Sequence, residues 1–141
     1  MNSYKLINDY NFGITSEIEL LEKLRNKFNP NLRLSSSNYS LFDYECDNMY
    51  VELKTRRCIK NYYKSTIIGM NKVKRAYDLI RLDSNIKIYF VFRFIDSICY
   101  YEFDEQEINQ LKQTMITRKD RRINGETGQY LEIPINKLID F

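Results

Sequence analysis

The sequence predicts a single α/β domain over residues 1–141, with a mixed central β-sheet of about five strands and helices on the faces of the sheet. Apolar residues recur at helical spacing near residues 16–28 and 70–82. Short runs rich in Tyr, Phe, Ile and Val, near residues 49–55, 86–94 and 98–103, are typical of strands. A chain of 141 residues that is 43% hydrophobic and 29% charged has the size and composition of one soluble globular domain.

The amino-acid composition excludes several classes of catalytic and metal site. The chain has no histidine, so Ser-His and Cys-His catalysis and histidine-dependent nucleases are excluded. Cys46, Cys58 and Cys99 are too scattered for a disulfide framework, a zinc site or an iron–sulfur cluster, so we expect reduced thiols in an intracellular protein. We expect no haem, iron–sulfur or nucleotide cofactor and no membrane partner. The net charge of +3 permits nucleic-acid binding, and the single alanine among many Asn, Lys, Ile and Tyr residues suggests an AT-rich coding sequence, as in a virus or parasite.

A first helix is expected to begin near Ser16 and to end before the Asn-Pro-Asn sequence at 29–31. Its apolar residues share one broad face, and Glu17 lies in the middle of that face. A carboxylate on an apolar face is unfavourable unless it is paired or bound to a metal. We therefore expect Glu17 to have an active-site role. The alternatives are that it complements the helix dipole or pairs with Arg25.

A hairpin is expected in the stretch that follows. Two apolar-aromatic runs, Tyr39–Glu45 and Met49–Thr55, flank a turn-prone Asp-Asn pair. Strand alternation directs Glu52 and Lys54 to the same side of the second run, and Asp43 comes close to Glu52 from the first run. Two carboxylates and a lysine at one point of a sheet could hold a divalent cation beside a base. The simpler alternative is an exposed strand pair that adds little to stability.

This pattern resembles the PD-(D/E)XK nuclease superfamily, which includes restriction endonucleases and the archaeal-type Holliday junction resolvases. The resemblance rests on Asp43, on the Glu52-Leu53-Lys54 sequence and on an upstream helical Glu17, and it extends from about residue 17 to residue 103. Phe42 stands where the family name has proline.

The resemblance implies a restriction-endonuclease-like fold and a set of roles. Asp43, Glu52, Lys54 and Glu17 would be catalytic. Asp43, Glu52, the carbonyl of Leu53 and Glu17 would hold Mg²⁺, with Mn²⁺ able to replace it.

Basic residues are the candidate DNA contacts. A basic, tyrosine-rich segment follows Thr55, a second helix is expected over Met70–Leu82, and a dense basic cluster lies at residues 118–122. In the family a polar residue early in the second helix often reaches the active site, and Lys72 holds that position. The candidates are Arg56, Arg57, Lys60, Lys64, Lys72, Arg118, Lys119, Arg121 and Arg122. Ordinary solvated loops are the alternative for the segment after Thr55 and for the cluster at 118–122.

The remaining segments complete the expected fold. Residues 86–94 and 98–103 read as strands joined at an Asp-Ser turn, and Asp104 opens a third helix that carries Ile108, Leu111 and Met115. Residues 130–133 are expected to form an edge strand and residues 136–139 a terminal helical turn.

The function that these observations favour is Mg²⁺-dependent hydrolysis of DNA phosphodiester bonds by an endonuclease, with a structure-specific, junction-resolvase-like activity as one form of it. Chain length and layout resemble the junction resolvases, which act as homodimers because two symmetric cuts need two sites. The first alternative is an inactive nucleic-acid-binding or protein-interaction module on a nuclease fold. The second is a structural subunit in which these charges lie on the surface.

Overall fold

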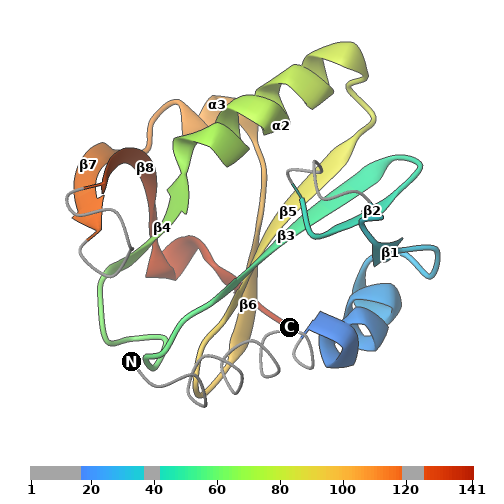
Figure 1. The fold of residues 1–141 in the computed structure, drawn as a ribbon, viewed down its shortest axis with the longest axis horizontal. Coiled ribbons are helices and arrows are strands. Elements are labelled where there is room, and N and C mark those ends of the chain that lie inside the picture. The colour runs from blue at the N-terminus through green and yellow to red at the C-terminus, as the bar shows by residue number, and fades with distance from the viewer. Residues whose placement is uncertain (1–16, 37–41, 119–125) are drawn as a thin grey trace.

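The computed structural model describes residues 17–36, 42–118 and 126–141, and the side chains at 117, 118, 126 and 127 are not described. Residues 17–27 form the N-terminal helix. The other elements follow along the chain (Figure 1). They are β1 (Arg33–Leu34), β2 (Tyr44–Cys46), β3 (Met49–Thr55), β4 (Ser65–Gly69), α2 (Met70–Leu82), β5 (Lys87–Arg93), β6 (Ile98–Glu102), α3 (Glu105–Ile108), β7 (Gln113–Arg118), β8 (Glu126–Pro134), the 3-10 helix η1 (Ile135–Lys137) and β9 (Ile139–Asp140).

A mixed six-stranded sheet forms the centre of the molecule, in the order β1-β2-β3-β5-β6-β9. The β2–β3 hairpin is confirmed, with Cys46 opposite Met49 across the expected two-residue turn. β3 runs parallel to β5, and all other neighbouring strands in this sheet are antiparallel. The connection from β3 to β5 passes through β4 and α2, because parallel neighbours cannot be joined by a tight turn.

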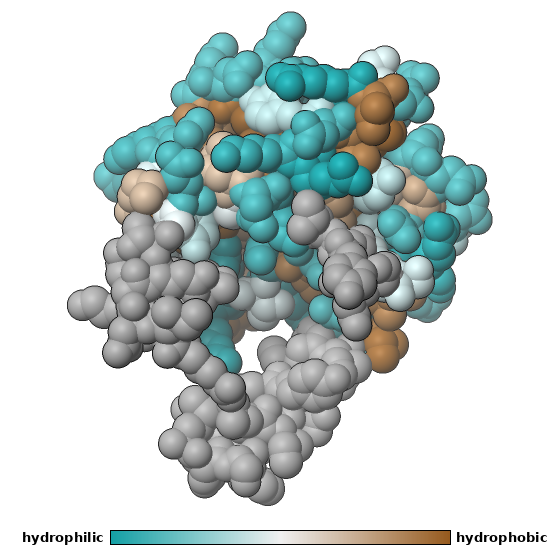
Figure 2. Space-filling view, turned by 45° about the horizontal axis from the view of Figure 1, so that its top comes forward, coloured by the Kyte–Doolittle hydropathy of each residue, from teal (hydrophilic) through white to brown (hydrophobic). Residues whose placement is uncertain are grey.

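Apolar side chains cover both faces of this sheet. On one face, Leu20 and Leu24 of the N-terminal helix pack with Val51 and Val91. On the other face, buried residues of α2, β5 and β8 form the larger core, including Val73, Phe90, Phe92, Leu131 and Ile133. The expected helix over Met70–Leu82 is confirmed with its buried stripe Val73, Ala76 and Leu79. Its outer side belongs to a mostly hydrophilic face (Figure 2).

A smaller sheet of three antiparallel strands lies beside the first, in the order β4-β8-β7. Two expectations were wrong here. The third helix ends at Ile108, and Gln113–Arg118 is a strand, because Thr114, Ile116 and Thr117 favour extended backbone and the pairing with β8 supplies their hydrogen bonds. Residues 130–133 are not an edge strand, since β8 is the central strand of the sheet.

The opening of the third helix was predicted correctly. Asp104 caps it by accepting the backbone N–H groups of Gln106 and Glu107 at 2.9 and 3.2 Å. The expected terminal helical turn is confirmed as the 3-10 helix η1, although it lies at Ile135–Lys137 rather than at residues 136–139. Ile139–Asp140 after it adds a short edge strand to the central sheet, which has six strands where about five were expected. In the part of the chain that the structure describes, no helix is long and apolar enough to cross a membrane.

Candidate active site

The β2–β3 hairpin holds the Asp43 side chain against β3. The Asp43 N–H donates to the carbonyl of Val51 at 3.0 Å, and Asp43 Oδ2 accepts the backbone N–H of Leu53 at 2.7 Å. This second bond ties the carboxylate directly to the strand that carries Glu52 and Lys54. The structure therefore brings together the three residues that the motif connects.

Glu52 is buried at the centre of the sheet, with only 3% of its surface exposed. It points toward α2, where Lys72 Nζ lies 2.8 Å from Glu52 Oε2. Lys72 sits in the first turn of α2, which crosses this face of the sheet. Lys72 was expected to contact DNA, and the structure shows that its ammonium forms an ion pair with the central carboxylate.

Burial and neighbouring charge change the acidity of the site. Desolvation, together with the nearby Asp43 carboxylate, raises the pKa of Glu52 to about 8, although Lys72 and Lys54 oppose the shift. Burial also lowers the pKa of the Lys54 ammonium; the cations of Lys72 and Arg56 act in the same direction and the Glu52 carboxylate acts against them. The Glu52 carboxyl therefore keeps its proton, and the Lys54 ammonium loses its proton, more readily than either group would in water. Perturbed groups of this kind often mark functional sites.

Glu17 lies at the edge of the same site. It is half-buried in the first turn described for the N-terminal helix, and its backbone carbonyl accepts a 2.7 Å hydrogen bond from the Tyr44 hydroxyl. Burial raises the pKa of Glu17, and the Asp43 carboxylate adds to the rise. Arg25 donates to the backbone carbonyl of Leu32 at 2.7 Å, so its guanidinium binds the segment that follows the N-terminal helix.

The donor set fits a divalent cation with a strong preference for oxygen. Asp43 and Glu52 lie close enough for their side chains to share a hydrogen bond when one of them is protonated. An ion near both would offset their repulsion. Among the described residues, no three acidic or cysteine side chains are gathered closely enough to enclose a metal. Two carboxylates completed by the Leu53 carbonyl, water and a substrate phosphate are nevertheless a common arrangement for Mg²⁺. A metal-ligand role for Glu17 remains a prediction.

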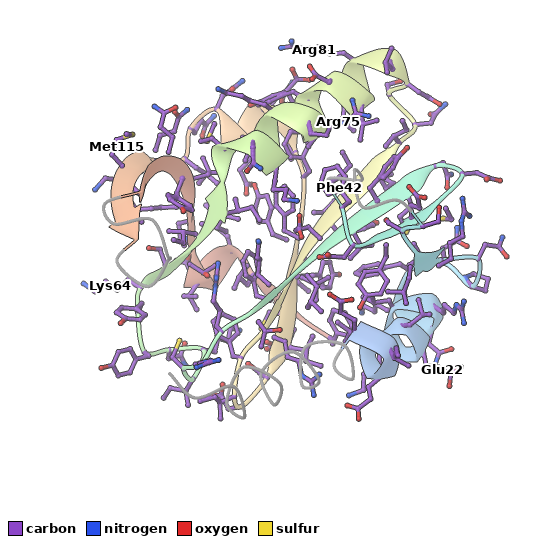
Figure 3. All side chains as sticks on the ribbon, in the orientation of Figure 1. Glu22, Phe42, Lys64, Arg75, Arg81 and Met115 are labelled. Atoms are coloured by element: carbon purple, nitrogen blue, oxygen red, sulfur yellow. The ribbon has the colours of Figure 1, made fainter. Side chains whose placement is uncertain are left out.

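Phe42, at the position of the family proline, has a structural role beside this site. It is buried in the core between the sheet and α2, and its ring lies 5.6 Å from that of Tyr50 (Figure 3). Lys72 Nζ lies 6.0 Å from the centre of the Phe42 ring. The ring therefore helps to hold the ammonium over Glu52.

The other predicted DNA contacts lie in different surroundings. The Arg56 guanidinium donates to the Ile67 carbonyl and to Thr66 Oγ1 and lies over the Phe92 ring, so it joins β3 to β4. Lys60 Nζ pairs with Asp140 at 2.9 Å. Arg57 and Lys64 are exposed.

The basic cluster at 118–122 falls largely outside the described residues. Arg118 ends β7, and its side chain is not described. Lys119, Arg121 and Arg122 lie beyond the described residues. A DNA-binding role for any of these side chains therefore stays a prediction.

The family resemblance had given Lys72 a position that often reaches the active site, but its ion pair with Glu52 was not predicted. The helical periodicity of α2 was visible, but a lysine one turn into a helix gives no signal of the strand that it will face. The available signal was Glu52 itself, because a carboxylate next to Val51 and Leu53 in a buried strand needs a cationic or metal partner.

A comparison with models of known protein families matches the part of the chain that contains Asp43, Glu52 and Lys54. A family model described as "Phage putative PDDEXK endonuclease" matches residues 20–139. A search of curated proteins found no match.

Proposed function

The chain belongs to the PD-(D/E)XK endonuclease family that this match identifies, and from that premise we propose that it hydrolyses phosphodiester bonds of DNA with the help of a divalent cation. The observation that supports the proposal most strongly is the meeting of Asp43, Glu52 and Lys54 on the β2–β3 hairpin. Asp43 is tied to the backbone of β3, and Glu52 is buried beside it. A rigid sheet positions such groups more accurately than a loop does.

In the proposed reaction Asp43, Glu52 and the carbonyl of Leu53 would hold Mg²⁺ or Mn²⁺. The bound ion would polarise the scissile phosphate and lower the pKa of the attacking water. Lys54, on the same side of β3 as Glu52, orients that water and offsets charge that builds on the phosphate. Its pKa, lowered by burial, also makes the neutral amine more accessible as a proton acceptor. Attack at phosphorus breaks the bond to the leaving oxygen, which takes a proton from solvent.

Lys72 has a place in this scheme. Its ammonium pairs with Glu52 at 2.8 Å and compensates a buried carboxylate while no cation is bound. Binding of a divalent cation at Glu52 would weaken that pair and leave the ammonium available to a phosphate oxygen. The side chain would then serve both as a stabilising partner and as a DNA contact.

The ion pair between Lys72 and Glu52 also favours a second candidate function, which is nucleic-acid binding without cleavage. In a module that binds nucleic acid without cutting it, a lysine could permanently take the place of the cation on Glu52. The binding module and the nuclease make opposite predictions for cleavage, since only the nuclease needs the Asp43 and Glu52 carboxylates to bind a metal.

The direct test is a cleavage panel. Four-way junction, flap, single-stranded and duplex DNA should each be incubated with the purified protein in Mg²⁺, in Mn²⁺ and in EDTA. We expect cleavage that requires a divalent cation and strongest activity on a branched substrate, with a homodimer supplying two sites on a junction. Binding without cleavage under all metal conditions would instead support the inactive module.

A further inference from the structure

A recess lined by Arg56 begins two residues beyond Lys54 of the candidate active site. It is a cavity of about 440 Å³, within the range of small-ligand pockets, and its walls come from the β3–β4 loop, β4, β7 and the 3-10 helix η1. Phe94, Ile116 and Ile135 provide apolar walls, and Tyr63 and Lys64 lie at the rim. In Figure 3 Lys64 lies on the same side of the molecule as β7 and its side chain is directed outward.

The position of this recess relates it to the cleavage site. Arg56, which lines it, follows Lys54 by two residues, and the Arg56 N–H still pairs with the Arg93 carbonyl at 2.8 Å. At 3.2–3.4 Å per extended residue, the two backbone positions are roughly 7 Å apart. A strand that carries a phosphate about every 3.4 Å spans that spacing with about two nucleotides, so a strand cut at Lys54 could pass the wall of the recess that Arg56 forms.

The charges around the recess match a nucleotide. Three cationic residues (Arg56, Lys60 and Lys64) and no carboxylate are among the described residues that line it. Lys60 already pairs with Asp140, and Arg56 is held by Thr66 and Ile67, so Lys64 is the rim cation best placed for a phosphate. Apolar walls under a cationic rim suit a flat, neutral base that remains attached to a charged backbone.

We propose that this recess receives the base of one unpaired nucleotide that lies within a step or two of the bond cut at Lys54. The inference rests on the proposed nuclease function and narrows its substrate to DNA with an unpaired nucleotide next to the cleavage point. A fully paired duplex would have to break a base pair to fill the recess, whereas a bulge, flap or junction offers an unpaired base at little cost.

Two pairs of variants test the recess. Ile116→Trp fills it from β7, and Met115→Trp is the matched control, because Met115 precedes it on the same strand, is 60% exposed and does not line the recess. Tyr63→Ala removes an aromatic residue from the rim. Ile59→Ala is its control, because Ile59 lies in the same loop, is 48% exposed and does not line the recess.

The measurement is DNA affinity by fluorescence anisotropy in Ca²⁺ with three otherwise identical duplexes. One carries a single bulged nucleotide, one carries an abasic bulge, and one is fully paired. The abasic duplex has the same flexible backbone without the base. We expect the wild-type protein to bind the base-bearing bulge about 5- to 150-fold more tightly than the abasic one, which corresponds to one stacked base. Ile116→Trp should abolish this preference and Tyr63→Ala should reduce it, whereas both controls should retain it.

Equal affinity for base-bearing and abasic bulges, or no DNA binding at all, would overturn the proposal. A preference that survives both Ile116→Trp and Tyr63→Ala would also overturn it. If Ile116→Trp does not fold, Tyr63→Ala decides by the same criterion. Cleavage is measured separately in Mg²⁺ and Mn²⁺: cleavage without the base preference rejects the recess alone, and the preference without cleavage rejects the nuclease function alone.

Discussion

Lys72 Nζ lies 2.8 Å from Oε2 of Glu52, so the central carboxylate of the site has a cationic partner supplied by α2. The side chains of the two residues are 18% and 4% exposed, respectively, so water screens the pair only weakly. The pair links the stability of the metal-free protein to the same carboxylate that the proposed reaction uses.

Replacing Lys72 by methionine should therefore destabilise the metal-free protein. Breaking a fully buried ion pair costs about 3–5 kcal/mol, and because Lys72 is partly exposed we expect about 1–3 kcal/mol. Urea denaturation in EDTA at about pH 9, above the pKa of Glu52, measures the loss. Lys74→Met is the control, since Lys74 lies one half-turn away on the exposed side of α2. Mn²⁺ should stabilise Lys72→Met more than the wild type, because the ion no longer competes with an ammonium. Equal stability of the two variants in EDTA would contradict this account of the pair.

The stability of the metal-free protein should also depend on the protonation of Glu52. Burial and Asp43 raise the pKa of Glu52 from its ordinary value of 4.5 to about 8, so the folded protein holds this proton more tightly than the unfolded chain does. The resulting stabilisation is fully present below pH 4.5 and is lost as the pH rises through 8. The urea concentration at the denaturation midpoint, measured in EDTA, should therefore decrease as the pH rises from about 4.5 to about 8 and should level off above that.

Glu52→Gln should remove most of that pH dependence, because the amide does not titrate. Glu45→Gln, a substitution on the neighbouring strand β2, should leave the dependence unchanged. If the profiles of the wild type and Glu52→Gln stay parallel over this range, the raised pKa of Glu52 is not what couples pH to stability.

Glu17 tests whether the N-terminal helix contributes to the metal site. Glu17→Ala should weaken Mn²⁺ binding in calorimetric titration while leaving the melting temperature unchanged or slightly raised, since the half-buried carboxylate and Asp43 disfavour each other's charge. Glu22→Ala is the matched control, because Glu22 points away from the sheet on the same helix (Figure 3). Unchanged metal affinity with a stability loss of about 0.3–1 kcal/mol would assign Glu17 to the helix dipole instead.

DNA affinity should fall steeply with salt because lysine and arginine displace counterions from phosphates. Neutralising Arg118, Lys119, Arg121 and Arg122 together should reduce the slope of log affinity against log salt by about one unit or more. Neutralising Lys23 and Lys27, exposed on the N-terminal helix, should leave that slope unchanged. An equal slope for the wild type and the fourfold variant would remove this cluster from the interface.

The sequence predicted those parts of the fold that depend on local patterns. The β2–β3 hairpin follows from alternation around a two-residue turn, and α2 follows from the apolar spacing of Val73, Ala76 and Leu79. Asp43 and Glu52 could be placed together because Asp43 directly precedes β2 and Glu52 lies on β3 of that one hairpin. The hairpin pattern and the resemblance to the nuclease superfamily were enough to predict that these two carboxylates lie close together.

The remaining features depend on contacts between distant segments. The strand at 113–118 was mistaken for a helix because Ile108, Leu111 and Met115 are compatible with helical spacing, and only pairing with β8 settles the backbone as extended. The hydrogen bonds that Arg56 donates to Thr66 and Ile67 of β4 could not be predicted from the sequence, and its expected contact with DNA stays a prediction. Such outcomes are set by how the second sheet packs on the first, which no local pattern reveals.

The central claim is that Asp43, Glu52 and Lys54 act as one metal-dependent site. Replacing either carboxylate removes a metal ligand, whereas replacing Lys54 leaves the ligands in place but removes the group that orients the water. Each of Asp43→Ala, Glu52→Ala and Lys54→Ala should lower the rate by orders of magnitude, and combinations should lower it little further, because residues that act as a unit are not additive. DNA binding in Ca²⁺ should persist in all three.

The most direct measurement is single-turnover cleavage of DNA in Mn²⁺ by the wild type, Glu52→Ala and Lys54→Ala, with Glu45→Ala and Lys87→Ala as controls on neighbouring strands. The account predicts that the wild type and both controls cleave the DNA, and that the two site variants lose at least about a hundredfold in rate. Wild-type rates for both Glu52→Ala and Lys54→Ala would contradict it.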